Sequence, residues 1–188
     1  METQKALGGI KVLDITSVIM GPFAGRLLGD MGADVIKVEP LAGDTVRGVG
    51  PMRNPAMGAF YMHSNRNKRS IALDLKHPQG KAALLRLAEK ADVLLYNVRP
   101  QAMERLGIGY DQLKSINPGL VYVGTYGFSQ DGPYSKRPAF DDLIQGLAGI
   151  PSLIALSGDG QPRYVPLAIM DRYVGVYAVN AVMGGLFH

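Results

Sequence analysis

Five short apolar segments, separated by stretches of helical character, constrain the fold of this sequence most strongly. They are GIKVLDIT (9–16), DVIKVEP (34–40), SIALDLK (70–76), DVLLYNV (92–98) and LVYVGTYGF (120–128). Runs of β-branched and apolar residues of this length are typical of strands buried within a sheet. Their alternation with helices predicts an α/β fold: a Rossmann-like, doubly wound parallel sheet with helices on both faces.

The segments between these strands carry helix start and stop signals, with proline near the beginning and glycine near the end of several. The expected helices are 21–33, 77–91, 100–107, 109–117, 140–150 and 171–187. Residues 41–67 are expected to form a long loop, and residues 152–166 a hairpin-like or irregular connection. No repeat or linker divides the chain, which predicts a single domain over residues 1–188.

Composition excludes several classes of protein. The 188 residues are 47% hydrophobic and 19% charged, as in a globular domain, and they include no cysteine, which excludes disulfides. The net charge of +4 is mild, and no basic, aromatic-rich helix suggests nucleic-acid binding. No apolar stretch reaches the length of a membrane span, and the N-terminus lacks a signal-peptide pattern. We therefore expect a cytoplasmic protein with neither nucleic acid nor membrane as partner.

The first strand-to-helix connection, DITSVIMGPFAG, lacks the glycine fingerprint of dinucleotide-binding folds, and no phosphate-binding GK[ST] loop occurs. A nicotinamide-dependent reductase is therefore disfavoured. The histidines His63, His77 and His188 do not have metal-ligand spacing, so no metal site is expected.

Asp171 is the one carboxylate in the apolar C-terminal segment MDRYVGVYAVNAVMGGLFH. One interpretation is a helix N-cap, because acidic side chains accept hydrogen bonds from the free N–H groups at a helix start. The other is a nucleophile: an ionised, poorly solvated carboxylate that attacks an activated acyl group such as a thioester. Spacing alone favours the cap.

Six blocks of the sequence, in order, carry a resemblance to a known family: GIKVLDIT, GADVIKVEP, NRNKRSIALDLK, ADVLLYNVRPQAMERLG, INPGLVYVGTYGF and PAFDDLIQGLAG. Together they resemble the class III (CaiB/BaiF-type) CoA-transferases, the group of formyl-CoA transferase, carnitine CoA-transferase and α-methylacyl-CoA racemase. The resemblance implies that residues 1–188 form the N-terminal, CoA-binding large domain. The small second domain and the returning C-terminal segment of the family are absent, so the chain would be a truncated product, a proteolytic fragment or half of a split enzyme.

The resemblance also implies a reaction and its residues. Asp171 falls on the family's nucleophile, which passes through an aspartyl-acyl anhydride and an aspartyl-CoA thioester to move CoA from an acyl-CoA to a carboxylic acid. CoA and acyl-CoA are substrates, with no tightly bound cofactor. The positions that match the family's CoA contacts are Val18, Leu73, Lys76, Asn97 and Arg105.

Three further residues match the substrate pocket of the family. Phe140 stands where the racemase has its histidine base, which favours transfer over racemisation. Ile19 replaces a glutamine of oxalate-using members, and Asp141 matches an acidic position beside the transferase site. An acyl-CoA racemase and a non-catalytic CoA-binding fragment that needs a partner chain remain alternatives.

The resemblance also implies an assembly. The full-length form is expected to be a homodimer, and a separate C-terminal half is possible. The isolated chain is expected to be inactive and prone to self-association. Met52, Met57 and Met62 could line an acyl pocket, although ordinary core packing is the favoured interpretation of these residues.

Overall fold

The computed structural model describes residues 5–188 and contains one sheet of five parallel strands. The strands are β1 (Lys11–Asp14), β2 (Asp34–Glu39), β3 (Lys68–Ala72), β4 (Val93–Tyr96) and β5 (Val121–Gly124). Their order across the sheet is β3-β2-β1-β4-β5, so the direction of winding reverses between β1 and β4. The sheet confirms the predicted doubly wound α/β fold.

The helices follow the strands in the alternation that the sequence predicts. They are α1 (Met20–Asp30), η1 (Thr45–Gly48), α2 (Ala59–Asn65), α3 (Pro78–Ala88), α4 (Pro100–Leu106), α5 (Tyr110–Ile116), α6 (Asp141–Leu147), α7 (Ile150–Ser157) and α8 (Ile169–Phe187). Among the helices of the described residues, none combines the length and apolar character that crossing a bilayer requires.

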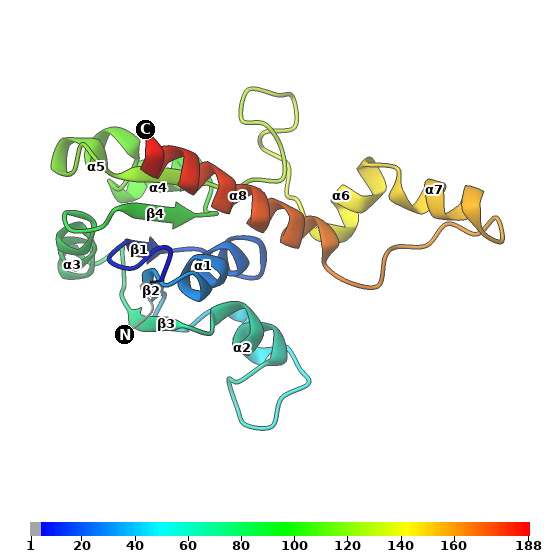
Figure 1. Cartoon of the computed structure of the whole chain (residues 1–188), viewed down its shortest axis with the longest axis horizontal. Coiled ribbons are helices and arrows are strands. Elements are labelled where there is room, and N and C mark those ends of the chain that lie inside the picture. The colour runs from blue at the N-terminus through cyan, green and yellow to red at the C-terminus, as the bar shows by residue number, and fades with distance from the viewer. Residues whose placement is uncertain (1–4) are drawn as a thin grey trace.

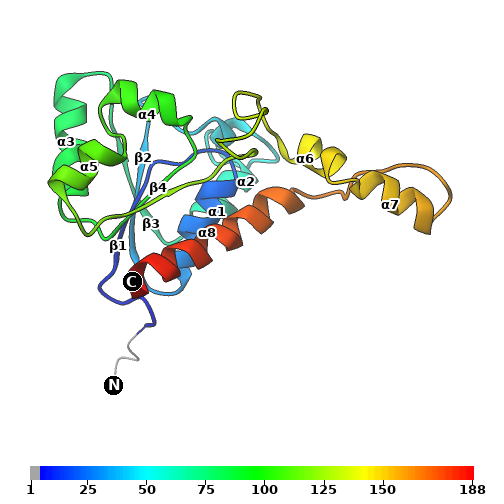
Figure 2. The ribbon, with the colours of Figure 1, turned by 90° about the horizontal axis from the view of Figure 1, so that it is seen from above.

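Each face of the sheet is covered by its own set of helices (Figures 1 and 2). On one face, α1 and α8 pack against alternate residues of the central strands, such as Val12 and Val93. On the other face, α3, α4 and α5 pack against the intervening residues of the same strands, such as Leu13 and Leu94. The two cores therefore follow the two-residue period of the strands.

Gly175 determines how closely α1 and α8 approach. A Cβ atom added at this position would lie 2.8 Å from the Phe23 ring and 2.9 Å from the Met20 carbonyl oxygen. Only glycine allows this distance between the helices. The close packing brings the start of α1 next to the first turn of α8, where Asp171 lies.

Two segments differ from their predicted structure. Residues 152–166 were expected to be hairpin-like, but α7 forms over Ile150–Ser157, with Pro151 in its first turn. A short apolar run does not distinguish a strand from a helix, and the proline favours a helix start. The predicted loop 41–67 contains η1 and α2, which packs beside α1.

Helices α6 and α7 project from the body of the domain as an arm (Figures 1 and 2). None of the residues of α7 is buried, although the helix is mostly apolar. The chain returns from this arm to the sheet through residues 158–168 and enters α8. Residues that are distant in sequence, in α6 and α8, thus meet at the base of the arm.

Candidate functional site

The largest hollow near the predicted CoA residues is a cavity of about 560 Å³ at the carboxyl ends of β1, β2 and β4. Its apolar floor includes Met103 and Ile108. Leu73 and Lys76, both predicted CoA contacts, line its edge just beyond β3. Ligands of doubly wound sheets bind at the carboxyl ends of the strands, close to the reversal point.

The loop between β1 and α1 forms one wall of this cavity. Val18, another predicted CoA contact, is partly exposed and has φ of 71°, in the left-handed region. Ser17 is held by Asn97: the Ser17 N–H donates to Asn97 Oδ1 over 3.0 Å, and Asn97 Nδ2 donates to the Ser17 carbonyl over 2.8 Å. Part of the hydrogen-bonding capacity of Asn97 is therefore used to fix the loop.

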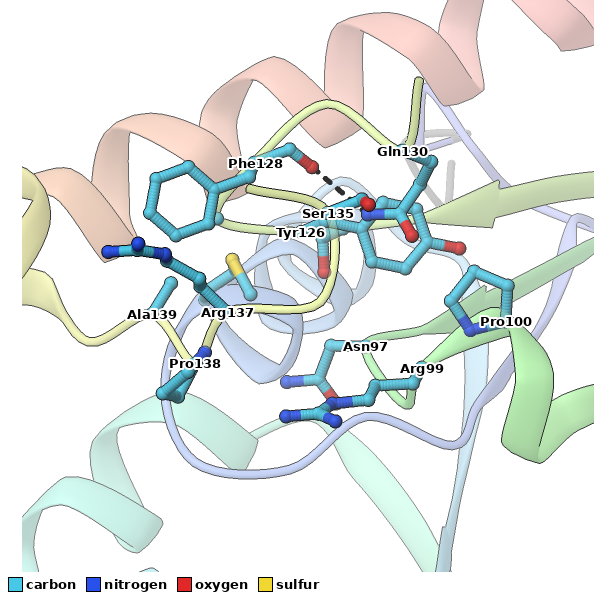
Figure 3. A pocket seen from close by; sticks show the side chains of 13 residues that line it. Asn97, Arg99, Pro100, Tyr126, Phe128, Gln130, Ser135, Arg137, Pro138 and Ala139 are labelled. Carbon is cyan, nitrogen blue, oxygen red and sulfur yellow. Dashed lines mark hydrogen bonds between the residues drawn. The ribbon is translucent and has the colours of Figure 1, made fainter. Parts of the chain in front are cut away.

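A second pocket, of about 220 Å³, lies on the other side of Asn97 (Figure 3). Besides Asn97, its polar lining includes Arg99, Gln130 and Arg137, while Tyr126 contributes an aromatic wall. Gln130 Nε2 donates to the Phe128 carbonyl over 3.0 Å, which holds the loop after β5 across the pocket. Because two guanidinium groups border it, the pocket suits an anionic group.

Asp171 borders a third and smaller hollow, of about 50 Å³, which shares Met20, Tyr126 and two further residues with the second pocket. Phe140 and Asp141 also line it. The structure thus brings the predicted nucleophile and two of the three predicted substrate-pocket residues together. The Ser17–Asn97 contact joins the walls of the first two cavities.

Asp171 is not the N-cap of its helix, so that interpretation is wrong. The N-cap position of α8 is Ala168, and Asp171 is the third residue of the helix. The cap comes instead from Asp141 of α6, whose Oδ1 accepts hydrogen bonds from the N–H groups of Met170 (2.7 Å) and Asp171 (3.1 Å). Asp171 is free of the capping role that sequence spacing suggested.

The surroundings of Asp171 raise its pKa to about 6. Burial of the carboxylate is the main cause, and the negative charge of Asp141 adds to it. Among residues 5–188, no cation or hydrogen bond contributes to offset these two effects. At pH 7 the carboxylate is mostly ionised but poorly stabilised, which is the state that a carboxylate nucleophile requires.

Gln145 connects the arm to α8 and is almost completely buried. Its Nε2 donates to Asp141 Oδ2 over 2.8 Å, and its Oε1 accepts from the Val165 N–H over 2.9 Å. Gln145 Nε2 also lies 3.3 Å from the Leu167 carbonyl oxygen. The side chain therefore orients the Asp141 carboxylate and fixes the segment that leads into α8.

Three predicted residues are not part of the lining of these three cavities: Val18 of the β1–α1 loop, Arg105 and Ile19. Arg105 is exposed in the last turn of α4, beside cavity residues Met103 and Leu106. Ile19 is half-buried at the N-cap position of α1, next to Met20 of the Asp171 hollow.

The methionines of the predicted loop do not line the three cavities. Met52, Met57 and Met62 are each at least 40% exposed. The structure therefore does not place them beside Asp171, as an acyl pocket would require. No group of His, Asp and Glu suited to a metal ion occurs within residues 5–188.

Some residues of the site were not recognised in the sequence. Arg99 is the N-cap residue of α4, in the short connection after β4, and its position near a strand end was a usable signal. Arg137 and Gln145 gave no such signal, because an arginine in a polar loop and a glutamine in a short helix are ordinary. The course of the loop after β5 brings Arg137 to the site, and the packing of α6 against α8 brings Gln145 there.

A protein-family model for CoA-transferase family III matches residues 7–188. The chain belongs to CoA-transferase family III. It is 41% identical to the succinate–glutarate CoA-transferase of Agrobacterium fabrum, covering 97% of this chain and 47% of that protein. It is 39% identical to the human succinyl-CoA:glutarate CoA-transferase, covering 99% of this chain and 42% of that protein.

Solved structures of this family have the same fold. The crystal structure of a CaiB/BaiF family protein from Brucella suis superposes with a TM-score of 0.92 at 36% identity, covering 98% of this chain and 50% of that one. Rv3272 from Mycobacterium tuberculosis superposes with a TM-score of 0.87 at 38% identity, covering 98% of this chain and 51% of that one. The chain spans about half the length of the family III relatives it matches.

Proposed function

We propose that this chain is the CoA-binding, nucleophile-bearing part of an acyl-CoA:carboxylate CoA-transferase, and that residues 1–188 form its large domain. One observation carries the proposal. Asp171, with a pKa raised to about 6, borders a hollow that shares walls with a pocket flanked by Arg99 and Arg137. Membership of CoA-transferase family III supports the same activity.

CoA would occupy the cavities in sequence. Its nucleotide end would bind in the 560 Å³ cavity against Leu73, with Lys76 and the nearby Arg105 attracting its phosphates. The pantetheine arm would pass Val18 and Asn97. Its thiol would then reach the hollow beside Asp171.

The chemistry follows from a poorly solvated carboxylate beside a thioester. Asp171 attacks the acyl carbon, the C–S bond breaks, and CoA leaves as a thiolate from an aspartyl-acyl anhydride. The thiolate attacks the aspartyl carbonyl of the anhydride, which releases the first acid and leaves an aspartyl-CoA thioester. The acceptor carboxylate then attacks this thioester and expels the thiolate. Thiolate attack on the acceptor's carbonyl releases the new acyl-CoA and regenerates Asp171.

The capped start of α8 would help this reaction in two ways. The positive end of the α8 dipole, where its first-turn N–H groups lie, would favour the negative charge that develops on the acyl oxygen during attack, while burial limits access of water to a reactive anhydride. Asp141 holds two of those N–H groups and keeps the turn in place. The competent assembly would contain further chain, in keeping with relatives of about twice the length, and we propose that it is a homodimer.

Racemisation of an acyl-CoA is the second candidate within the family. Phe140, 65% exposed at the N-cap of α6, borders the Asp171 hollow and offers no acid or base. This side chain favours transfer over proton abstraction. A non-catalytic CoA-binding fragment would retain the cavities but form no covalent intermediate.

Intact-protein mass spectrometry tests the proposal. The chain, alone and with the remaining half of a full-length family III enzyme, is incubated with succinyl-CoA, the donor named for the human relative. Hydroxylamine then traps the activated carboxylate. We expect a hydroxamate at Asp171 only in the complete assembly, and none in Asp171→Asn. If the wild-type assembly forms a hydroxamate at another residue and none at Asp171, the nucleophile assignment is wrong.

A further inference from the structure

The β1–α1 loop has an unusual backbone for its sequence. Val18 has φ of 71°, a conformation that β-branched residues rarely adopt and that dinucleotide-binding loops normally assign to glycine. The loop is nevertheless glycine-free from Thr16 to Met20. A strained conformation persists only when surrounding contacts impose it.

Those contacts account for most of the backbone polar groups of residues 16–18. The Thr16 N–H donates to Asp14 Oδ1 over 2.9 Å, and Asn97 holds both polar groups of Ser17. Lys37 Nζ donates to the Thr16 carbonyl over 2.9 Å. The Val18 N–H donates to both oxygens of Asp44, at 3.2 and 3.3 Å.

Lys37 and Asp44 are themselves an ion pair, with Lys37 Nζ 2.9 Å from Asp44 Oδ2 and both side chains 1% exposed. The pair thus holds the loop at two points, the Thr16 carbonyl and the Val18 N–H. The Asp44 N–H donates in turn to Glu39 Oε2 over 3.0 Å, which anchors the pair to the end of β2. These hydrogen bonds offset the free-energy cost of removing the two charges from water.

We infer that Lys37 and Asp44 are positioning residues for CoA binding. The pair holds Val18, which is 37% exposed, in the left-handed conformation at φ of 71°, and so replaces the glycine of an ordinary dinucleotide loop. This inference rests on the proposed function. Asp44 borders the 560 Å³ cavity, but its side chain is 1% exposed, so the pair acts through the loop.

One consequence concerns how the loop recognises its ligand. In a glycine-rich loop, free backbone N–H groups bind phosphate. Here the N–H groups of Thr16, Ser17 and Val18 are already bonded to side chains. The loop therefore offers CoA the Val18 side chain, and the phosphates must find their cationic partners elsewhere.

A double-mutant cycle tests the inference on the full 188-residue chain. CoA affinity is measured by calorimetry for wild type, Asp44→Asn, Val18→Gly and the double variant, with Asp159→Asn as a control. Asp159 pairs with Arg163 on the arm and is exposed, so its substitution removes the same charge without touching the loop. Amide hydrogen exchange of Ser17 and Val18 is measured in parallel.

We expect Asp44→Asn to weaken CoA binding by about tenfold or more, because that factor corresponds to the free-energy cost of one strained backbone conformation. We also expect faster amide hydrogen exchange at Ser17 and Val18. In the Val18→Gly background the same substitution should have a clearly smaller effect, because glycine adopts φ of 71° without strain. Asp159→Asn should change neither quantity. Equal effects of Asp44→Asn in both backgrounds, or acceleration spread evenly over the sheet, would overturn the inference.

A folding defect in Asp44→Asn would not end the test. The charge-neutral double variant Lys37→Met/Asp44→Asn leaves no unpaired buried charge and should fold. Its amide hydrogen exchange at Ser17 and Val18 should be accelerated as in Asp44→Asn. Exchange as slow as in wild type would refute the inference that the Lys37–Asp44 pair holds the loop. If wild type does not bind CoA, the proposed function fails, whereas the exchange data still decide whether the pair holds the loop.

Discussion

Asp141 caps the helix that carries Asp171: its Oδ1 accepts hydrogen bonds from the N–H groups of Met170 and Asp171, at 2.7 and 3.1 Å. The same carboxylate adds to the rise in the pKa of Asp171 by like-charge repulsion. One side chain therefore both fixes the helix start and keeps the proposed nucleophile poorly stabilised. The two effects are separable by substitution.

Asp141→Asn should lower the pKa of Asp171 from about 6 while keeping it above its ordinary value of 3.8, because burial, the larger cause, remains. The asparagine retains an oxygen for the α8 N–H groups but loses its bond from Gln145. Asp141→Ala removes the cap as well and should cost about 0.5–2 kcal/mol of stability. Carboxyl-carbon NMR titration measures the pKa, and an unchanged midpoint in Asp141→Asn would contradict the repulsion.

Asp171→Asn should stabilise the fold at neutral pH. The folded-state pKa of about 6 lies above the ordinary 3.8, so ionisation penalises the folded state increasingly as pH rises from about 4 to about 6. Removing the charge should gain about 1–3 kcal/mol at pH 7.5, or about 2–4 °C in Tm for each kcal/mol. Thermal unfolding at pH 7.5 and pH 4 measures the difference.

The gain from Asp171→Asn should be mostly lost at pH 4, close to the ordinary pKa of 3.8. A lower Tm in Asp171→Asn at pH 7.5 would instead indicate that Asp171 has a structural role.

Lys76→Ala and Arg105→Ala should each weaken CoA binding and reduce its dependence on salt, because each removes a cation near the proposed phosphate sites. Lys90→Ala is the matched control, since Lys90 is exposed just beyond the C-terminal end of α3 and does not line the 560 Å³ cavity. Calorimetry at two salt concentrations separates the variants. Wild-type affinity in both Lys76→Ala and Arg105→Ala would remove these residues from the site.

The chain on its own should self-associate and show no transferase turnover. Leu153 is 63% and Leu156 84% exposed on α7, and Phe187 is 84% exposed at the end of α8. Exposed apolar patches of this kind drive association. Light scattering should show oligomers that the double substitution Leu153→Lys/Leu156→Glu reduces. A monodisperse monomer with normal thioester exchange would contradict both expectations.

The pH dependence of the complete enzyme should follow the ionisation of Asp171. Because the carboxylate form is the proposed nucleophile, kcat/KM should fall about tenfold for each pH unit below about 6. A pH–rate profile of a full-length assembly measures the midpoint. Asp141→Asn should move that midpoint in the acid direction, and a profile that is flat between pH 5 and 7 would exclude Asp171 as the titrating group.

The sequence by itself determined the sheet and the family. The five apolar segments and the proline and glycine signals between them are local features, and local features specify strands and helices directly. The apolar C-terminal segment singled out Asp171, and the family resemblance then favoured the nucleophile over the cap. Gly107 ends α4 where the sequence pattern predicts. The CoA roles of Leu73 and Lys76 stay predictions, although the structure places both at one cavity.

Only the tertiary structure decided the surroundings of Asp171. Asp141 lies thirty positions earlier, as the sequence separation of its bond to the Asp171 N–H shows, and no local pattern reveals that it caps α8. The same holds for Lys37 and Asp44, whose pairing depends on how the segment after β2 folds back over the β1–α1 loop. Burial and repulsion act through space, so the pKa of Asp171 and the conformation of Val18 arise only when packing has brought distant segments together.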